Sequence, residues 1–328
     1  MITNEYGIHT FSLKFQCKYS EIQNIIEQNE CIRTNKGNLG LSSYYQMPQF
    51  KDVGVEIQLG QSVSHPCWLI LIVNPSSLLA GTYKPTALFQ ADKESVQQVK
   101  HHLRNILDKI GVDWRLREFK LSRCDLTCNL YYERKADVQD RLDIFKKSFP
   151  IPHYSAVKFG KHPNSDERFK GANKHSWTIT NKSKSCTFSA YDKTYELEKR
   201  HHIVINEHIL RLELRFGRSK IIKITKVKDW ESQLIEFGSQ VEKQQQKFLH
   251  RLHMMHFDPI PLPELLDRIN ASKYREKTKK KLRRIAKKAN GCVSLAAVQK
   301  DCRIKKFEFI KLLGKFEEMG VGCISSKL

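Results

Sequence analysis

Tyr191 is the residue of this sequence whose position best suits a nucleophile. It ends an alternating run, residues 186–191, that predicts a β-strand, and a charged stretch with Lys193 and Tyr195 follows it. A phenol with an ordinary pKa of about 10 attacks a phosphodiester only where a cation or a base favours its ionised form. The sequence therefore predicts that Tyr191 attacks a phosphate, with Lys193 adding positive charge beside it.

Tyr195 follows Tyr191 by four residues, so both side chains lie on one side of the segment if it is helical. A second tyrosine at this spacing is a candidate acceptor for a DNA end in a later strand transfer. A packed aromatic ring is the alternative interpretation of Tyr195.

Three acidic residues stand on the polar faces of predicted strands: Asp125, Glu213 and Glu56. A carboxylate in the middle of a strand is costly to bury without a partner or a metal, so Asp125 is either a salt-bridged structural residue or a cation ligand. If the three strands are neighbours in one sheet, the carboxylates supply the hard oxygen ligands that Mg²⁺ or Mn²⁺ prefers. Such a cation neutralises the scissile phosphate and assists the leaving 3′-oxygen.

The elements that position these residues are predicted from hydrophobic periodicity. Short, β-branched or aromatic and mostly alternating segments predict strands at residues 8–15, 53–59, 68–73, 119–131, 176–180, 186–191 and 209–216. Residues 93–110 and 136–149 have helical periodicity. The mixture predicts an α/β or α+β fold with one sheet covered by helices.

The sequence pattern changes after residue 230, where polar helical segments replace the mixture of strands and helices. Residues 230–256 predict one long polar helix, and the three prolines in residues 258–263 predict a linker, because proline cannot continue a helix. Beyond it, the sequence predicts a small helical module with apolar positions Leu295, Val298, Phe307, Ile310, Leu313 and Phe316. We therefore place a sheet-based domain at residues 1–257 and a basic helical module, binding DNA or a protein partner, at residues 258–328.

Composition indicates a polyanionic partner. The chain carries 57 Lys and Arg against 35 Asp and Glu, a formal charge of +22. Nucleic acid is favoured over a membrane because no stretch approaches the roughly 18 apolar residues of a spanning helix, and no N-terminal signal segment is visible. The nine cysteines, odd in number and without a CxxC pair, indicate reduced thiols of a cytoplasmic protein rather than disulfides or a zinc site.

Basic side chains in three regions are predicted to contact DNA. Residues 269–288 carry ten basic side chains against Glu276 alone, and residues 159–174 form a basic loop that closes over a strand or is simply solvated. Arginines on the polar faces of two strands complete the set. The candidates are Arg123, Arg211, Arg215, Lys170, Lys174, Lys279, Lys280, Lys281, Arg283 and Arg284.

Three short motifs occur in a characteristic order: Ser-Arg-x-Asp at residues 122–125, Ala-Tyr-x-Lys-x-x-Glu-Leu at 190–197, and hydrophobe-Arg-x-Glu-x-Arg at 210–215. This order resembles the filamentous-phage gene II replication proteins and related plasmid initiators of rolling-circle replication, over residues 50–217. The resemblance implies an antiparallel central sheet covered by helices, with Tyr191 as the nicking tyrosine and Asp125 and Glu213 at a metal site. Many such nickases use a His-hydrophobe-His strand, which this sequence lacks, so the resemblance favours carboxylate ligands.

The predicted function is that of a rolling-circle replication initiator. It nicks one DNA strand at an origin through Tyr191, keeps the 5′ end as a phosphotyrosine and later rejoins the strand; the helical module binds the origin or a host helicase. A conjugative relaxase or transposase-like nickase, with the same chemistry on a mobile element, is one alternative. A non-catalytic DNA-binding regulator is the other, with RNA as a further possible ligand.

Overall fold

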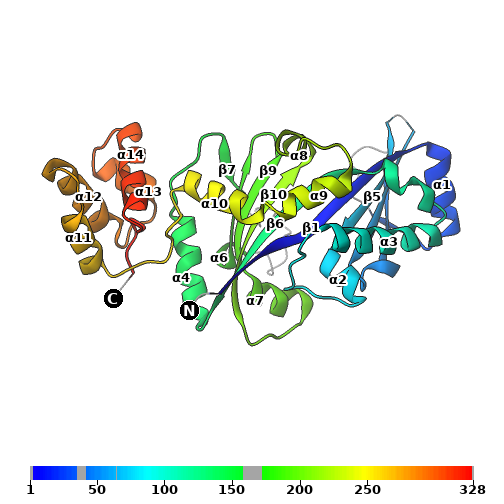
Figure 1. Cartoon of the computed structure of the whole chain (residues 1–328), viewed down its shortest axis with the longest axis horizontal. Helices are drawn as coiled ribbons and strands as arrows, with labels where there is room; N and C mark the ends of the chain where they lie inside the picture. Colours follow the sequence, from blue (N-terminus) through cyan, green and yellow to red (C-terminus); the bar gives the residue numbers. More distant parts are fainter. Residues whose placement is uncertain (1–2, 35–41, 64, 158–171, 327–328) are drawn as a thin grey trace.

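The computed structural model describes residues 3–34, 42–63, 65–157 and 172–326, and an antiparallel sheet runs through most of this length (Figure 1). The ten strands of the sheet lie in the order β2-β3-β4-β5-β1-β6-β10-β9-β8-β7, and every neighbouring pair is antiparallel. Their bounds are β1 Thr3–Cys17, β2 Ile32–Thr34, β3 Ser42–Met47, β4 Val55–Ser62, β5 Cys67–Val73, β6 Lys120–Tyr132, β7 Tyr154–Ala156, β8 Ser176–Asn181, β9 Cys186–Asp192 and β10 His208–Gly217. The predicted α+β class with an antiparallel central sheet is confirmed.

Helices cover the sheet and form the C-terminal end of the chain. Their bounds are α1 Tyr19–Gln28, α2 Pro75–Ala80, α3 Lys93–Lys109, α4 Lys135–Lys146, α6 Ala172–His175, α7 Lys193–Glu196, α8 Arg218–Ile224, α9 Trp230–Gly238, α10 Val241–Leu252, α11 Leu262–Ala271, α12 Glu276–Ala289, α13 Leu295–Asp301 and α14 Lys306–Glu318. Several begin at a side-chain cap: Asp92 accepts a hydrogen bond from the Ser95 amide at the start of α3. No described helix is long and apolar enough to cross a membrane.

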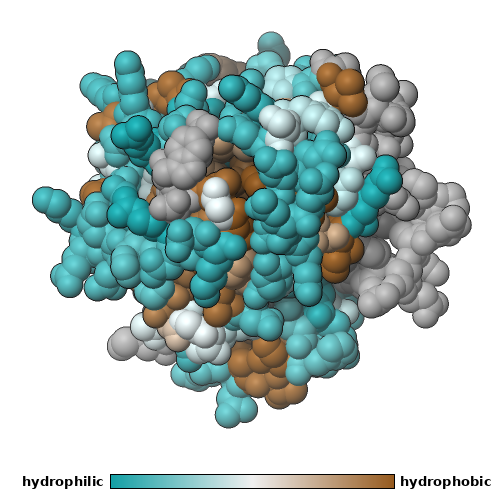
Figure 2. Space-filling view, turned by 90° about the vertical axis from the view of Figure 1, so that its right-hand side faces the viewer, coloured by the Kyte–Doolittle hydropathy of each residue, from teal (hydrophilic) through white to brown (hydrophobic). Residues whose placement is uncertain are grey.

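Two amphipathic helices, α1 and α3, cover the β4–β5 end of the sheet. α3 buries Val96, Val99 and Leu103 at the three-to-four-residue spacing of one helix face. The outer surface at this end is mostly hydrophilic, with hydrophobic patches broken up by polar side chains (Figure 2). The charged sides of α1 and α3 therefore remain in water, while the apolar stripes of the two helices complete the core.

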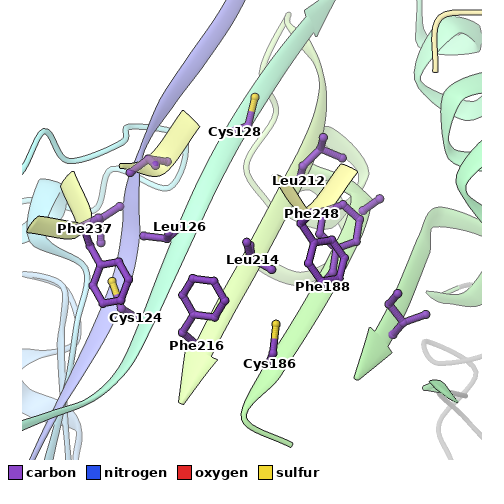
Figure 3. Packing of buried hydrophobic residues seen from close by; sticks show 14 of the residues in the cluster. Cys124, Leu126, Cys128, Cys186, Phe188, Leu212, Leu214, Phe216, Phe237 and Phe248 are labelled. Carbon is purple, nitrogen blue, oxygen red and sulfur yellow. The ribbon is translucent and has the colours of Figure 1, made fainter. Parts of the chain in front are cut away.

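The middle of the sheet has one apolar and one polar face. On β6, Cys124, Leu126 and Cys128 point to the apolar face, and Phe237 of α9 and Phe248 of α10 cover it (Figure 3). Burying a large apolar side chain stabilises the fold by about 2 kcal/mol. The intervening polar residues of β6, β9 and β10 are thereby fixed on the opposite face, which forms the candidate site.

The prediction of one long helix at residues 230–256 was wrong, because the chain forms α9 and α10 with a break after Gly238. A Cβ atom at Gly238 would lie 2.8 Å from both the Cβ and the carbonyl oxygen of Ala91. The close approach of α9 to the segment before α3 thus requires glycine, and the chain turns at Ser239 before α10 begins. The polar pattern alone gave no sign of this packing constraint.

Helices α11 to α14 gather at one end of the molecule, beside α4 and α10 (Figure 1). Of the linker predicted at residues 258–263, residues 258–261 are non-helical, whereas Pro263 lies in the first turn of α11, where proline is tolerated. The Leu295 amide donates to the Lys147 carbonyl over 2.8 Å, and the rings of Phe149 and Phe309 lie 5.3 Å apart. The helices therefore pack on the sheet-based part, while the boundary at residue 258 stays a prediction.

Candidate active site

A cavity of about 990 Å³ opens on the polar face of the sheet. Its lining residues come from β1, β6, β8, β9 and β10, with further residues from α7 and the π-helical turn Leu197–His201. Six residues predicted from the sequence line it: Arg123, Tyr191, Lys193, Tyr195, Glu213 and Arg215. The fold thus brings the candidate nucleophile, an acid and several cations into one space.

Strand pairing places Tyr191 diagonally across from Glu213. In the β9–β10 register, Tyr191 faces Arg211 and Ser189 faces Glu213. Diagonal neighbours of this kind lie about 7–8 Å apart, a distance that long side chains span. The Tyr191 hydroxyl donates to Glu213 Oε2 over 3.3 Å, and the tyrosine stays partly exposed at the cavity. The pair has the arrangement of a nucleophile and its base.

The electrostatics of the pair favour a neutral phenol and a carboxylate ready to accept its proton. Burial raises the pKa of Tyr191 well above its usual value, and the nearby Glu213 carboxylate raises it further. Burial also raises the pKa of Glu213, with repulsion from Asp125 adding to it, while Arg215 opposes the shift. A carboxylate with a raised pKa is a stronger base, so the proton of Tyr191 has an acceptor in place.

Asp125 lies fully buried beneath the cavity and is held by two arginines. Nε of Arg123 donates to its Oδ1 over 2.9 Å, and Nε of Arg215 donates to the same oxygen over 3.0 Å. Burial acts to raise the pKa of Asp125, but the two guanidinium groups outweigh it and lower that pKa. The geometry thus places Asp125 in salt bridges, while its role as a cation ligand stays a prediction.

The three predicted carboxylates do not form a metal site. Glu56 lies on β4, four strands from β10, which at about 4.8 Å per strand is about 19 Å. Its carboxylate accepts hydrogen bonds from Gln46 and Gln58 instead. The described part of the chain contains no group of three or more His, Cys, Asp or Glu side chains able to hold a metal ion. The assignment of Glu56 as a ligand is therefore corrected, and the residues as placed do not fit a dedicated cation site.

Arg211 is fully buried and does not reach a DNA surface, contrary to its assignment as a DNA contact. Its Nε donates to Asn129 Oδ1 over 2.8 Å and its Nη2 to the Thr86 carbonyl over 3.0 Å. The segment after Thr86 can pack closely against β1 because residue 7 is glycine; a Cβ there would lie 2.7 Å from the Leu88 Cβ. Arg211 supports the site from below, and its charge lowers the pKa of Tyr191 against the effect of burial.

Lys193 and Tyr195 are fixed by partners at the start of α7. Lys193 is 2% exposed and its ammonium lies 2.6 Å from Glu196 Oε2; burial lowers its pKa, while Glu196 opposes this. The Tyr195 ring stacks on His175 with ring centroids 3.6 Å apart. Both residues line the cavity, Lys193 as an enclosed cation and Tyr195 as part of an aromatic wall.

His9 lines the cavity and was missed from the sequence. It is the extra residue of a bulge in β1, where pairing with β6 shifts between Ile8 and Thr10. Burial lowers its pKa well below the usual value, and the nearby charges of Arg211 and Lys193 lower it further. The signal was present: the apolar positions of this strand alternate through Phe11, Leu13, Phe15 and Cys17, except for the three-residue step from Ile8 to Phe11.

The remaining predicted DNA contacts that the structure describes do not line the cavity. Lys174 is exposed at α6, and Lys170 lies outside the described residues. Five others belong to α12: Lys279, Lys280, Lys281, Arg283 and Arg284. Lys281 pairs with Glu308 of α14, Arg283 pairs with Glu276, and Lys280 is exposed. The structure therefore separates two groups of cations, one around Tyr191 and one on the C-terminal helices.

Comparison with known proteins gives little. No family model matches the chain, and no curated protein matches it. Among solved structures, the rolling-circle replication initiator protein from Geobacillus stearothermophilus is similar with a TM-score of 0.34 and 8% identity, covering 76% of this chain and 86% of that chain. A likeness at this level establishes neither a shared family nor a shared site.

Proposed function

We propose that the protein nicks and rejoins one DNA strand at a replication origin through a phosphotyrosine on Tyr191, as a rolling-circle initiator does. The observation that carries the proposal is the hydrogen bond from the Tyr191 hydroxyl to Glu213, 3.3 Å long, in a cavity lined by cations. The Tyr191 oxygen attacks the phosphorus, and its proton passes to Glu213. The bond from phosphorus to the 3′-oxygen breaks, and that oxygen takes up a proton. The retained phosphoester lets a 3′-hydroxyl reverse the step without ATP.

The cations around the cavity suit a phosphodiester whose phosphoryl group is being transferred. Arg123 and Arg215 have side chains 28% and 41% exposed, so each can meet a phosphate oxygen while Asp125 holds its position. Lys193 adds a third positive charge beside Tyr191. Fixed charges of this kind stabilise a phosphoryl transition state without reorganisation. In this proposal, Asp125 orients the two arginines and takes no part in bond making.

The test compares two tyrosines of the same cavity. Wild type, Tyr191→Phe and Tyr195→Phe are incubated with supercoiled plasmid carrying the replicon's origin, with Mg²⁺ or Mn²⁺ and with EDTA. We expect Tyr191→Phe to lose nicking and the covalent adduct but to keep DNA binding, because only the nucleophilic oxygen is removed. Tyr195→Phe keeps the first nick, since its ring still stacks on His175.

The outcomes separate the alternatives. Full-rate nicking by Tyr191→Phe rules out the nucleophile, and DNA binding without any nicking by wild type supports the regulator. Loss of rejoining alone in Tyr195→Phe assigns it the second transfer. The EDTA arm tests the Mg²⁺ or Mn²⁺ requirement, which stays a prediction. Nicking at origins of transfer rather than of replication favours the relaxase alternative.

A further inference from the structure

Helices α13 and α14 are joined by a tight turn that the proposed chemistry does not use. α13 ends at Asp301, α14 begins at Lys306, and four residues, 302–305, separate them. Arg303 adopts the left-handed conformation with φ 48°, and the Ile304 amide turns back to the Gln299 carbonyl over 3.3 Å. Two short helices linked by a turn of this length form the supersecondary unit known as a helix-turn-helix.

A shared core fixes the two helices against α12. The buried side chains are Val298 of α13, Cys302 and Ile304 in the turn, and Phe309 and Leu312 in α14. Leu282, Ile285 and Ala286 supply the buried face of α12. The arrangement is therefore a packed three-helix unit, and the outward side of α14 is held in a defined orientation.

The outward side of α14 carries residues that a folded interior does not explain. Lys305, Lys306 and Lys311 are exposed, and Phe307 is 72% exposed even though it is a large aromatic residue. The Lys311 ammonium lies 4.5 Å from the centre of the Phe307 ring. A single apolar ring among lysines suits a surface that meets both phosphates and apolar base edges, such as the methyl group of thymine.

Cations of α12 flank the same surface. Lys281 pairs with Glu308 in the first turn of α14, and Arg284 donates to the Asp301 carbonyl at the end of α13 over 3.4 Å. Lys288 lies one further turn along α12, near enough to Cys302 in the turn to lower its pKa against the effect of burial. The basic side of α12 thus runs beside the turn and the start of α14.

We propose that α13 and α14 form a helix-turn-helix that binds duplex DNA, with the first turns of α14 in the major groove and α12 along the phosphate backbone. In such units the second helix reads base edges with residues near its N-terminus. Lys306 and Phe307 hold these positions, Lys306 as a donor to guanine and Phe307 against thymine. The inference rests on the proposed function only in taking DNA as the polyanion.

The test uses the full chain and duplexes with randomised centres, from which wild type first selects a preferred sequence. Lys306→Ala with Phe307→Ala is compared with Ile222→Ala with Lys223→Ala, an exposed lysine and apolar residue on α8. We expect the α14 variant to bind the selected duplex at least about tenfold more weakly. We also expect the slope of log affinity against log salt concentration to become smaller in magnitude by roughly one. The α8 variant binds as wild type, and both cleave single-stranded origin oligonucleotides at the wild-type rate.

A photo-crosslinker attached at Phe307→Cys gives a second readout that does not depend on the stability of the double variant. It labels bases of the duplex, whereas the same group at Ile222→Cys does not. Equal duplex affinity in the two double variants, or no crosslink from position 307, overturns the helix-turn-helix. If Tyr191→Phe still nicks while the α14 substitutions weaken duplex binding, the proposed chemistry fails and this inference stands. If Tyr191→Phe loses nicking while the α14 substitutions leave duplex binding unchanged, only this inference is overturned.

Discussion

The sheet cavity and the C-terminal helices carry positive charge in opposite ways. Around Tyr191 the arginines are held by acids, with Arg123 and Arg215 both bonded to the buried Asp125. Along α12 and α14, Lys280 and Lys306 stand exposed in water. Freely exposed charges attract a polyanion at long range and are screened by salt, whereas charges held in place by a buried partner act on a single group at a fixed distance. In the two proposals above, the net charge of +22 therefore serves two separate tasks.

The largest effect that sharpens this comparison is expected from Glu213→Gln. Glutamine keeps the shape of the side chain but cannot take the proton of Tyr191, so we expect the nicking rate to fall by about 10²–10⁴-fold. Glu56→Gln, an acid of the same sheet far from the cavity, leaves the rate unchanged. Single-turnover formation of the covalent adduct measures both, and equal rates for the two variants would remove Glu213 as the base.

The pH dependence of the nicking rate gives an independent test of Glu213 as the base. Glu213 acts only as the carboxylate, and burial raises its pKa above the usual 4.5. The wild-type rate should therefore fall on acidification as the pH passes through that raised pKa. Glu213→Gln lacks this acidic limb, since glutamine does not titrate.

A smaller effect is expected from Asp125→Asn. Removing the charge leaves Arg123 and Arg215 without their shared anion; because both guanidinium groups stay partly exposed, we expect a loss of about 1–2 kcal/mol in the free energy of unfolding, less than for a fully buried pair. Lys280→Gln on the exposed side of α12 changes stability by less than about 0.5 kcal/mol. Urea unfolding of both variants tests the contrast between fixed and exposed charge; similar losses would abolish it.

The smallest effect concerns His9. Its folded pKa lies well below the usual 6.5, so below that pH the unfolded chain takes up a proton that the folded chain does not. Stability should therefore decrease as the pH falls through 6.5, by at most about 1.4 kcal/mol per pH unit. His9→Gln loses this part of the pH dependence, while His102→Gln, at an exposed position on α3, retains it. Unfolding free energies measured on both sides of that pH decide between them.

The strands that carry the site were predictable because their side chains mostly alternate with a two-residue period. The predicted segments at residues 119–131, 186–191 and 209–216 correspond to β6, β9 and β10. The short strands β2, β3 and β7 were not predicted, because strands of three to six residues with polar sequences have too few apolar positions to show a period. Phe307, expected as a core position, is exposed, since apolar character alone does not say what an aromatic side chain faces.

By itself, the sequence determined the polar and apolar faces of each central strand, and it predicted a polyanionic partner and Tyr191 as the residue to test. Alternation and charge are local properties, so they can be read along the chain. Only the tertiary structure decided which acid meets Tyr191. Strand order places Glu213 on the strand next to Tyr191 and Glu56 five strands from Tyr191, and the two arginines converge on Asp125. Strand order depends on the packing of the whole core, which no local pattern encodes.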